Sequence, residues 1–194
     1  MAKLYFNYAT MNAGKSTLLL QASYNYRERG MGTFVLTAAM DDRAGKNKVA
    51  SRIGIDQKAT GYAATDNLYD IIYKQVKTTP TACIFVDEAQ FLTPDQVWQL
   101  ARVVDDLDVP VMAYGLRVDF MGKTFPGSAS LLALADEMKE VKTICYCGKK
   151  ATMVVRQDAD GNVQTGGDQI LIGGNDTYVS LCRRHWRQAM ETDA

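Results

Sequence analysis

Residues Ala9–Thr17 read ATMNAGKST, the most informative short stretch of the chain. It matches the end of the phosphate-binding pattern G-x-x-x-x-G-K-[ST], which would run here from Ala9 to Ser16. A strand precedes such a loop and a helix follows it, so that backbone N–H groups and the positive end of the helix face the phosphates. The apolar run Lys3–Ala9 and the helical pattern that begins at Lys15 supply both neighbours. The stretch therefore predicts a phosphate-binding loop in an α/β domain.

The first position of this loop departs from the pattern, because glycine usually stands where this chain has Ala9. Alanine fits without strain if its φ is negative, and it costs about 1 kcal/mol or more if φ must be left-handed. We expect a negative φ, since the groups that bind phosphate come mainly from the later residues. The alternative is a plain strand-to-helix turn with an exposed lysine.

The remaining positions of the loop carry the chemistry of nucleotide binding. Lys15 would reach the β and γ phosphates, and the hydroxyl of Ser16 would ligate Mg²⁺. We assign nucleotide binding to the whole loop: Ala9, Thr10, Met11, Asn12, Ala13, Gly14, Lys15 and Ser16.

A second motif, IFVDE at Ile84–Glu88, ends a buried strand in two acids. Ligands of an open parallel sheet bind beyond the carboxyl ends of its strands, so Asp87 would share a crevice with the loop and hold Mg²⁺ there. The alternative is that Asp87 caps the next helix. Glu88, beside the metal, would accept a proton from an attacking hydroxyl. A substrate alcohol would make the protein a kinase and water would make it an ATPase, and these two motifs do not decide between them.

Four metal-ligating residues form two close pairs, Cys145 with Cys147 and Cys182 with His185, on either side of a β-rich segment. Three thiolates and one imidazole make the closed tetrahedral shell of a structural zinc site. The C-x-C spacing of the first pair is tighter than the usual C-x₂-C, and the alternative is core cysteines with an exposed histidine. Cys83 lies inside the strand before Asp87 and is expected to be part of the core.

The composition is that of an ordinary globular chain of 194 residues, with 47% apolar and 23% charged residues. Lys plus Arg and Asp plus Glu each number 22, and the net charge of zero argues against a bulk electrostatic grip on nucleic acid or membrane. No apolar run approaches the roughly 20 residues that cross a bilayer, and the N-terminus lacks the apolar core of a signal peptide. We therefore expect a cytoplasmic protein.

Alternating strand and helix patterns predict an α/β fold with a mainly parallel sheet in residues 1–140. The expected strands are 3–9, 33–38, 82–86 and 109–116, and the expected helices are 15–29, 67–77, 94–106 and 131–139. Thr93 is the expected N-cap of the third helix, with Pro94 at its first position. The polar residues 40–60 predict a loop. Residues 141–194 predict a small β-rich zinc-binding module closed by a short helix, with the turn signal DADGN at 158–162.

Three stretches together resemble one known family: MNAGKST, DEAQFL and IGGNDTYVSLCRRH. They are similar to the cellular, zinc-containing type of thymidine kinase, and most of all to its bacterial branch, over about residues 3–189. The resemblance implies a RecA-like P-loop core, a zinc module and an assembly of four chains. It also implies Mg²⁺-dependent transfer of the γ-phosphate of ATP to the 5′-hydroxyl of thymidine or deoxyuridine, with feedback binding of dTTP as a further expectation.

The resemblance also implies roles for particular residues. Glu88 would be the general base, and Lys15 and Arg43 would stabilise the transferring phosphate, with Asp41 and Gln90 joining Asp87 in the ATP and Mg²⁺ site. The thymidine pocket would be lined by Met11, Phe91, Leu116, Phe120, Phe125 and Tyr178. A "lasso" loop, Gln169, Ile170, Leu171, Ile172 and Gly173, would close over the base and bind it largely through main-chain groups. Without the resemblance, the alternative for Phe91, Phe120 and Phe125 is a place in the hydrophobic core.

Two other classes of protein compete with a kinase. A RecA-like ATPase or nucleic-acid motor would use the zinc module, with Lys149, Lys150, Arg183 and Arg184, to grip DNA. The absence of a basic excess argues against it, and we expect no nucleic-acid partner. A non-enzymatic nucleotide sensor would need neither Asp87 nor Glu88, so the two acids argue against that class.

Overall fold

The computed structural model of the chain describes residues 1–41, 45, 47–170 and 177–192. Its largest sheet, within these residues, has six strands, and all the pairings between them are parallel. From edge to edge the strands are β5 (Thr60–Tyr62), β2 (Thr33–Ala38), β6 (Cys83–Val86), β7 (Val111–Leu116), β1 (Leu4–Ala9) and β8 (Glu137–Glu140). The predicted α/β fold with a mainly parallel sheet is therefore confirmed.

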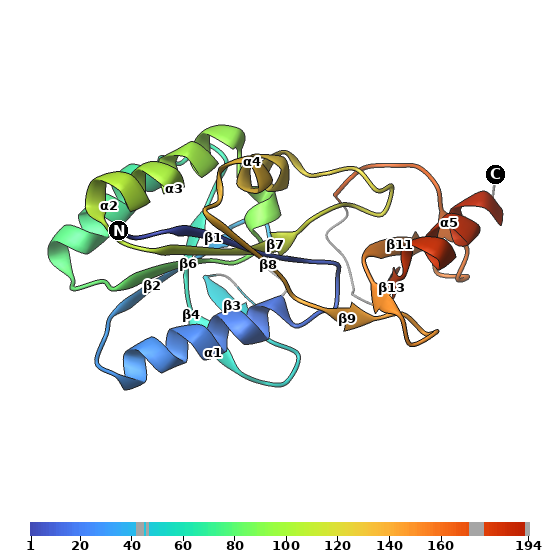
Figure 1. Ribbon diagram of the computed structural model, residues 1–194, viewed down its shortest axis with the longest axis horizontal. Coiled ribbons are helices and arrows are strands. Elements are labelled where there is room, and N and C mark those ends of the chain that lie inside the picture. Colours follow the sequence, from blue (N-terminus) through green and yellow to red (C-terminus); the bar gives the residue numbers. More distant parts are fainter. Residues whose placement is uncertain (42–44, 46, 171–176, 193–194) are drawn as a thin grey trace.

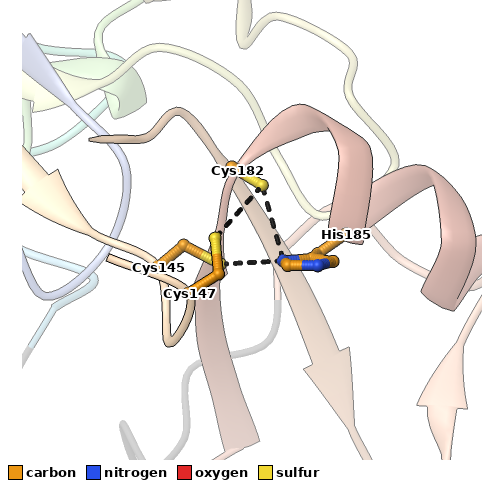
Figure 2. Close-up of side chains that lie close together, drawn as sticks. All are labelled: Cys145, Cys147, Cys182 and His185. Carbon is orange, nitrogen blue, oxygen red and sulfur yellow. Dashed lines mark hydrogen bonds between the residues drawn. The ribbon is translucent and has the colours of Figure 1, made fainter. Parts of the chain in front are cut away.

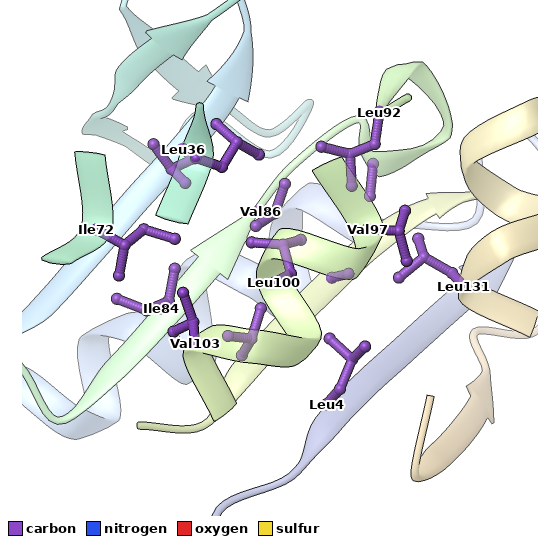
Figure 3. Close-up of a cluster of buried hydrophobic side chains, with 14 of the residues drawn as sticks. Leu4, Leu36, Ile72, Ile84, Val86, Leu92, Val97, Leu100, Val103 and Leu131 are labelled. Atoms are coloured by element: carbon purple, nitrogen blue, oxygen red, sulfur yellow. The ribbon is translucent and has the colours of Figure 1, made fainter. Parts of the chain in front are cut away.

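Helices cover both faces of this sheet (Figure 1). One face packs against α1 (Lys15–Glu28), and the other against α2 (Leu68–Thr78), α3 (Pro94–Leu107) and α4 (Pro126–Leu134). The larger core cluster fills the space under α2, α3 and α4, where Ile72, Leu100 and Leu131 meet the strands (Figure 3). Parallel sheets are buried on both faces, which is why their strands read as continuous apolar runs.

The strand β6 demonstrates this burial residue by residue, because its four side chains alternate between two cores. Ile84 and Val86 belong to the cluster under α2, α3 and α4, while Cys83 and Phe85 belong to the cluster under α1. All four are fully buried. Burial also raises the pKa of the Cys83 thiol to about 12, so this cysteine is a core residue, as expected.

The start of α3 follows the sequence signals closely. The hydroxyl of Thr93 accepts a hydrogen bond from the Gln96 N–H, and the Gln96 side chain accepts one from the Thr93 N–H, each at 3.1 Å. This reciprocal pair is a capping box, and Pro94 occupies the first turn. The predicted cap is therefore confirmed, and it fixes where the chain turns after the acidic end of β6.

Two predicted segments were wrong. The helix expected over 131–139 begins earlier, at Pro126, and ends at Leu134, while Glu137–Glu140 forms the edge strand β8 beside β1. Its side chains are mostly exposed, so the strand carries no apolar pattern that sequence reasoning can detect. The loop expected over 40–60 contains an antiparallel hairpin of β3 (Lys48–Ala50) and β4 (Asp56–Lys58). Strands of three residues are too short to show a period of two.

A small antiparallel module follows β8, as predicted. It pairs β9 (Thr143–Ile144) with β10 (Lys150–Ala151), and places β11 (Met153–Gln157) between β12 (Val163–Gln164) and β13 (Tyr178–Leu181). The helix α5 (Arg183–Thr192) closes it, and the module lies at one end of the large sheet (Figure 1). The division into units 1–140 and 141–194 stays a prediction. No helix among the described residues combines the length and apolar character that a membrane span needs.

The DADGN turn joins β11 to β12 as expected. The Asp158 carboxylate accepts hydrogen bonds from the N–H groups of Asp160 and Asn162, both at 2.9 Å. The hydrogen bond from the Asn162 side chain, and then those from the backbone, hold the pKa of Asp158 below its usual value. The turn is therefore locked by local polar contacts, as an Asp followed by Gly predicts.

Candidate active site and metal centre

The phosphate loop joins the end of β1 to the start of α1. Ala9 is the last residue of β1 and keeps a negative φ, as predicted, whereas Asn12 and Gly14 take the left-handed conformation with φ of 62° and 84°. Asparagine and glycine are the residues that tolerate this region best. No side chain caps the first turn of α1, so its N–H groups face the loop. The loop therefore turns at Asn12 and Gly14, and alanine at position 9 causes no strain.

The outer side of the loop is held by the C-terminal module. The Thr10 hydroxyl donates to the Met153 carbonyl of β11 at 3.0 Å, and the Ser180 hydroxyl of β13 donates to the Met11 carbonyl at 2.6 Å. The ammonium group of Lys15 donates to the Thr10 carbonyl at 3.4 Å. The Thr10 side chain is therefore engaged with the module, and the module stabilises the shape of the loop.

The carboxylate of Asp87 faces the loop from the end of β6. Its Oδ2 accepts a hydrogen bond from the Ser16 hydroxyl at 3.1 Å, while its buried Oδ1 has no hydrogen-bond donor among the described residues. Burial, and secondarily the charge of Glu88, raises the pKa of Asp87 to about 7, although Lys15 opposes the shift. A buried carboxylate oxygen without a donor is well suited to a cation. The pair Ser16 and Asp87 therefore fits a Mg²⁺ ion.

Glu88 follows at once, at the start of the short 3₁₀ helix η1 (Ala89–Phe91). Its φ is 51°, a left-handed value that is strained for glutamate and that is typical of functional positions. The Gln90 side-chain amide donates to the Glu88 carboxylate, and its oxygen accepts from the Leu116 N–H at 2.9 Å. Because a backbone N–H can only donate, this contact fixes which end of the Gln90 amide faces Glu88.

Two glycines allow neighbouring elements to approach η1 closely. A Cβ atom at Gly127 of α4 would lie 2.5 Å from the Leu92 carbonyl oxygen, and one at Gly115 of β7 would lie 2.9 Å from the Gln90 nitrogen. Both contacts are with backbone atoms, which cannot move aside as a flexible side chain can. The two glycines thus let β7 and α4 pack against the segment that carries Glu88.

A single cavity of about 480 Å³ joins the phosphate loop to an apolar region. Its lining includes the loop from Met11 to Ser16 together with Asp41, Asp87, Glu88 and Gln90. It also includes the eight described residues predicted to bind the nucleoside: Met11, Phe91, Leu116, Phe120, Phe125, Gln169, Ile170 and Tyr178. Its volume is typical of a small-molecule site.

Some predicted residues are placed elsewhere. Ala9 and Thr10 are buried and do not line the cavity. Arg43 and the lasso residues Leu171, Ile172 and Gly173 lie outside the described residues. Phe120 and Phe125 are buried, with exposed fractions of 1% and 4%, and they also line the cavity. These two rings therefore belong to the core and to the pocket at the same time.

Other lining residues were missed by sequence reasoning. Thr37, Lys48 and Asp119 line the cavity, as does Arg52, whose guanidinium donates to the Asn12 side chain. Lys48 and Arg52 belong to the β3–β4 hairpin, which the sequence presented only as a polar loop. Their positive charge was visible in the sequence, but their place beside the phosphate loop was not, because the two segments are far apart in the chain.

The four predicted metal ligands converge in the C-terminal module (Figure 2). All four ligand atoms lie within 4.8 Å of one another. The Nδ1 atom of His185 lies 3.3 Å from the Cys145 sulfur and 3.5 Å from the Cys182 sulfur, and the sulfurs of Cys147 and Cys182 are 4.0 Å apart. A tetrahedral zinc site places its ligand atoms roughly 3.6–3.8 Å apart. The cluster therefore has the composition and the dimensions of a structural zinc site.

The surroundings of Cys145 favour its thiolate form. Burial raises the pKa of Cys145, but backbone N–H groups of Cys147 and Cys182 and the His185 side chain outweigh it and lower this pKa to about 6. The Tyr146 ring stacks on His185 with centroids 4.5 Å apart and fixes the plane of the imidazole. Metal ligands are commonly oriented by such outer contacts.

The position of the phosphate loop after β1, with the two acids after β6, places the chain in the class of P-loop nucleotide-binding α/β proteins. The fold is similar to that of a solved ATPase domain, with a TM-score of 0.52, 13% identity, and coverage of 84% of this chain and 79% of that one. More specifically, the chain belongs to the thymidine kinase family, whose sequence model matches residues 2–186. It is therefore an enzyme of the ATP-dependent deoxynucleoside kinase type.

Curated relatives agree with this assignment over almost the whole chain. A thymidine kinase of Ruegeria pomeroyi is 69% identical over 189 residues, which are 97% of this chain and 96% of that protein. The thymidine kinase of Rhizobium meliloti is 62% identical and that of Shewanella oneidensis 56%, each covering at least 97% of this chain and 98% of the relative.

Proposed function

We propose that this enzyme transfers the γ-phosphate of ATP to the 5′-hydroxyl of thymidine or deoxyuridine and releases the 5′-monophosphate and ADP. The observation that carries the proposal is the single cavity in which the phosphate loop and two acids meet an apolar, aromatic region. The dimensions suit a nucleoside whose hydroxyl points toward the loop. Membership of the thymidine kinase family supplies the substrate class.

The phosphate end of the cavity would position and neutralise the triphosphate. Backbone N–H groups from Met11 to Gly14 would cradle the phosphates, with Lys15 beside the β and γ groups. Ser16 and Asp87 would hold Mg²⁺, which when bound neutralises charge on the transferring phosphate. The Asp87 Oδ1 atom without a described donor supports this role. Arg43 and Asp41 are proposed to act near the same phosphate.

Glu88 is the proposed general base. Its carboxylate would accept the proton of the 5′-hydroxyl as the oxygen attacks the γ-phosphorus and the bond to the ADP oxygen breaks. The Tyr62 hydroxyl donates to the Glu88 carbonyl at 3.3 Å, and Gln90 holds the carboxylate. These contacts support a fixed orientation, which phosphoryl transfer needs more than covalent chemistry.

The apolar end would bind the pyrimidine base. Phe91 and Phe125 meet edge to face, with ring centroids 6.2 Å apart and planes at 82°. Such a wall suits a flat ring that carries a methyl group. The lasso from Gln169 to Gly173 is proposed to read the polar edge of the base through main-chain groups.

The Cys₃His cluster is proposed to bind one structural zinc ion through Cys145, Cys147, Cys182 and the Nδ1 atom of His185. The closed ligand set leaves no position for a substrate, so the metal would stabilise the fold and take no part in the reaction. An assembly of four chains and feedback binding of dTTP are further proposals, which rest on the family resemblance. Sedimentation of the purified protein and inhibition by added dTTP test them.

One assay tests the reaction itself. ATP consumption is measured with thymidine, with deoxyuridine, with single-stranded DNA and with no addition. We expect stimulation by the two nucleosides and the appearance of the 5′-monophosphate. A protein that consumes ATP with DNA but not with thymidine would be a motor, and the proposal would be wrong.

Replacing Glu88 tests the general base. Glu88→Gln keeps the size and the hydrogen-bonding capacity of the side chain, and we expect kcat to fall roughly 10²–10⁴-fold with little change in ATP binding. Glu28→Gln, an exposed position at the end of α1, is the matched control and should keep the parent kcat. A Glu88→Gln enzyme with the turnover of the parent would exclude the role.

A further inference from the structure

We propose that Arg156 and Trp186 are positioning residues that hold the Phe120 ring as a fixed wall of the nucleoside pocket. The inference rests on the proposed function, because it assumes that thymidine occupies the apolar end of the cavity. Neither residue lines the cavity. Each acts through Phe120, which does.

Arg156 covers one face of the Phe120 ring. It lies in β11 and is 4% exposed, and its guanidinium carbon is 3.9 Å from the ring centroid. A cation at this distance over an aromatic face is attracted to the ring, and the attraction grows when water is excluded. The contact therefore fixes the plane of the ring, because tilting it would separate the two flat groups.

The guanidinium is itself held by three hydrogen bonds. Its Nε donates to the Gln164 side chain at 2.6 Å, Nη1 donates to the Asp168 carbonyl at 2.8 Å, and Nη2 donates to the Gly166 carbonyl at 3.4 Å. A Cβ atom at Gly167 would lie 2.8 Å from Nη2, so the chain wraps the group closely. The rigid fork of arginine matches this set of acceptors, which lysine cannot satisfy in the same way.

The acceptors of Arg156 within the described residues are neutral oxygens. Burying a charge without an anionic partner is costly, and an apolar side chain of similar length would fill the space without that cost. The contact with Phe120 gives the arginine a role beyond its hydrogen bonds within the module, because the residue connects the segment Gly166–Asp168 to the wall of the pocket.

Trp186 holds the backbone of the same phenylalanine. Its indole N–H donates to the Phe120 carbonyl at 2.9 Å from α5, one residue after the metal ligand His185. A Cβ atom at Gly122 would lie 3.3 Å from the Trp186 ring, so the turn after Phe120 packs directly on the indole. Phe120 is therefore fixed at its ring by β11 and at its backbone by α5.

Binding of a flat base depends on the orientation of the rings around it, so loosening Phe120 should weaken the binding of the nucleoside and leave ATP unaffected. For Arg156→Met we expect the KM for thymidine to rise about tenfold, with the KM for ATP within about twofold of the parent. Arg156→Lys retains the charge and should give an intermediate KM. Trp186→Phe keeps an aromatic ring without the N–H and should raise the same KM about threefold.

Arg102→Met is the matched control. Arg102 lies over the Tyr69 ring, with 4.3 Å from its guanidinium carbon to the centroid, on the exposed surface of α3. Replacing Arg102 also removes an arginine that lies over an aromatic ring, but neither Arg102 nor Tyr69 lines the cavity. The KM values for thymidine and for ATP should therefore stay at the parent level. Zinc content is measured for every variant and should not change.

Three results would overturn the inference. The first is a folded Arg156→Met enzyme with the parent KM for thymidine. The second is a rise in both KM values together with loss of zinc, which would make Arg156 a general structural residue. The third result applies if Arg156→Met does not fold: the inference is then wrong if Arg156→Lys and Trp186→Phe both keep the parent KM for thymidine. A parent enzyme that does not phosphorylate thymidine would instead refute the proposed function, so the two failures are distinct.

Discussion

At the residue scale, the phosphate loop shows how one unusual position is accommodated. Ala9 belongs to β1 and pairs with Leu116, so the requirement for a left-handed backbone falls on Asn12 and Gly14. Glycine is required only where φ is positive or where a neighbour comes too close. The common glycine at the first position of the motif is therefore not needed here.

Replacing Ala9 by glycine tests this explanation. Ala9→Gly should lower the free energy of unfolding by about 0.5–1 kcal/mol, because glycine has more backbone entropy to lose in a strand. The kcat and the KM for ATP should remain at the parent level. Steady-state kinetics gives kcat and KM, and chemical unfolding gives the stability. Ala113→Gly in the neighbouring strand β7 is the control, because it measures the cost of glycine in a strand outside the loop. Faster turnover of Ala9→Gly would contradict our account of the loop.

Glu88 illustrates the limit of residue-level prediction. The motif IFVDE and the family resemblance indicated its role as a base. Its left-handed φ was not predictable, because glutamate has no local preference for that conformation. The segment that follows Glu88 is packed closely by distant elements, with Gly127 against the Leu92 carbonyl and Gly115 against Gln90.

At the element scale, predictions succeeded where a local signal was strong. The N-terminus of α3 was predicted correctly, because its signals are local: Thr93, Pro94 and Gln96 lie within four residues and act on one another's backbone. The edge strand β8 and the β3–β4 hairpin were missed, because their pairing partners are distant or their strands are very short. The helix expected over 131–139 overlapped the residues that form β8.

Removing the cap of α3 measures its contribution. Thr93→Ala leaves the Gln96 N–H without its hydroxyl acceptor and should lower the free energy of unfolding by about 1 kcal/mol. Thr78→Ala is the control, because the Thr78 hydroxyl donates to carbonyls of its own helix, α2. Thermal and chemical unfolding of both variants should show the loss for Thr93 alone. Equal stability of the two variants would exclude a capping role.

At the scale of the whole molecule, the C-terminal module completes the candidate active site, because Val154 and Tyr178 line the same cavity as the phosphate loop. Its strands hold the phosphate loop through Met153 and Ser180, and its helix holds Phe120 through Trp186. Two members of the Cys₃His cluster, Cys145 and Cys182, lie in the core of the same module with Val155 and Leu181. A metal that ties these segments together would therefore act on both ends of the cavity without touching a substrate.

Loss of the metal should affect both substrates. Cys147→Ser removes one ligand, and we expect less than one zinc per chain, a lower melting temperature and higher KM values for both ATP and thymidine. The double effect distinguishes this variant from Arg156→Met, which should raise only the thymidine value. Cys83→Ala is the matched control, because Cys83 lies in the core of the large sheet, and it should keep its zinc. Full zinc content in Cys147→Ser would refute the ligand assignment.

The α/β class, the phosphate-loop motif, the two acids of IFVDE and the four proposed metal ligands could all be recognised in the sequence. These features depend on short patterns of backbone and side-chain chemistry, which act over a few residues. The contacts around Phe120 came from the tertiary structure alone: Arg156 lies over its ring, and the Trp186 indole donates to its carbonyl. Such contacts join segments that are far apart in the chain, and they depend on how whole helices and strands pack. A short sequence pattern therefore cannot predict them.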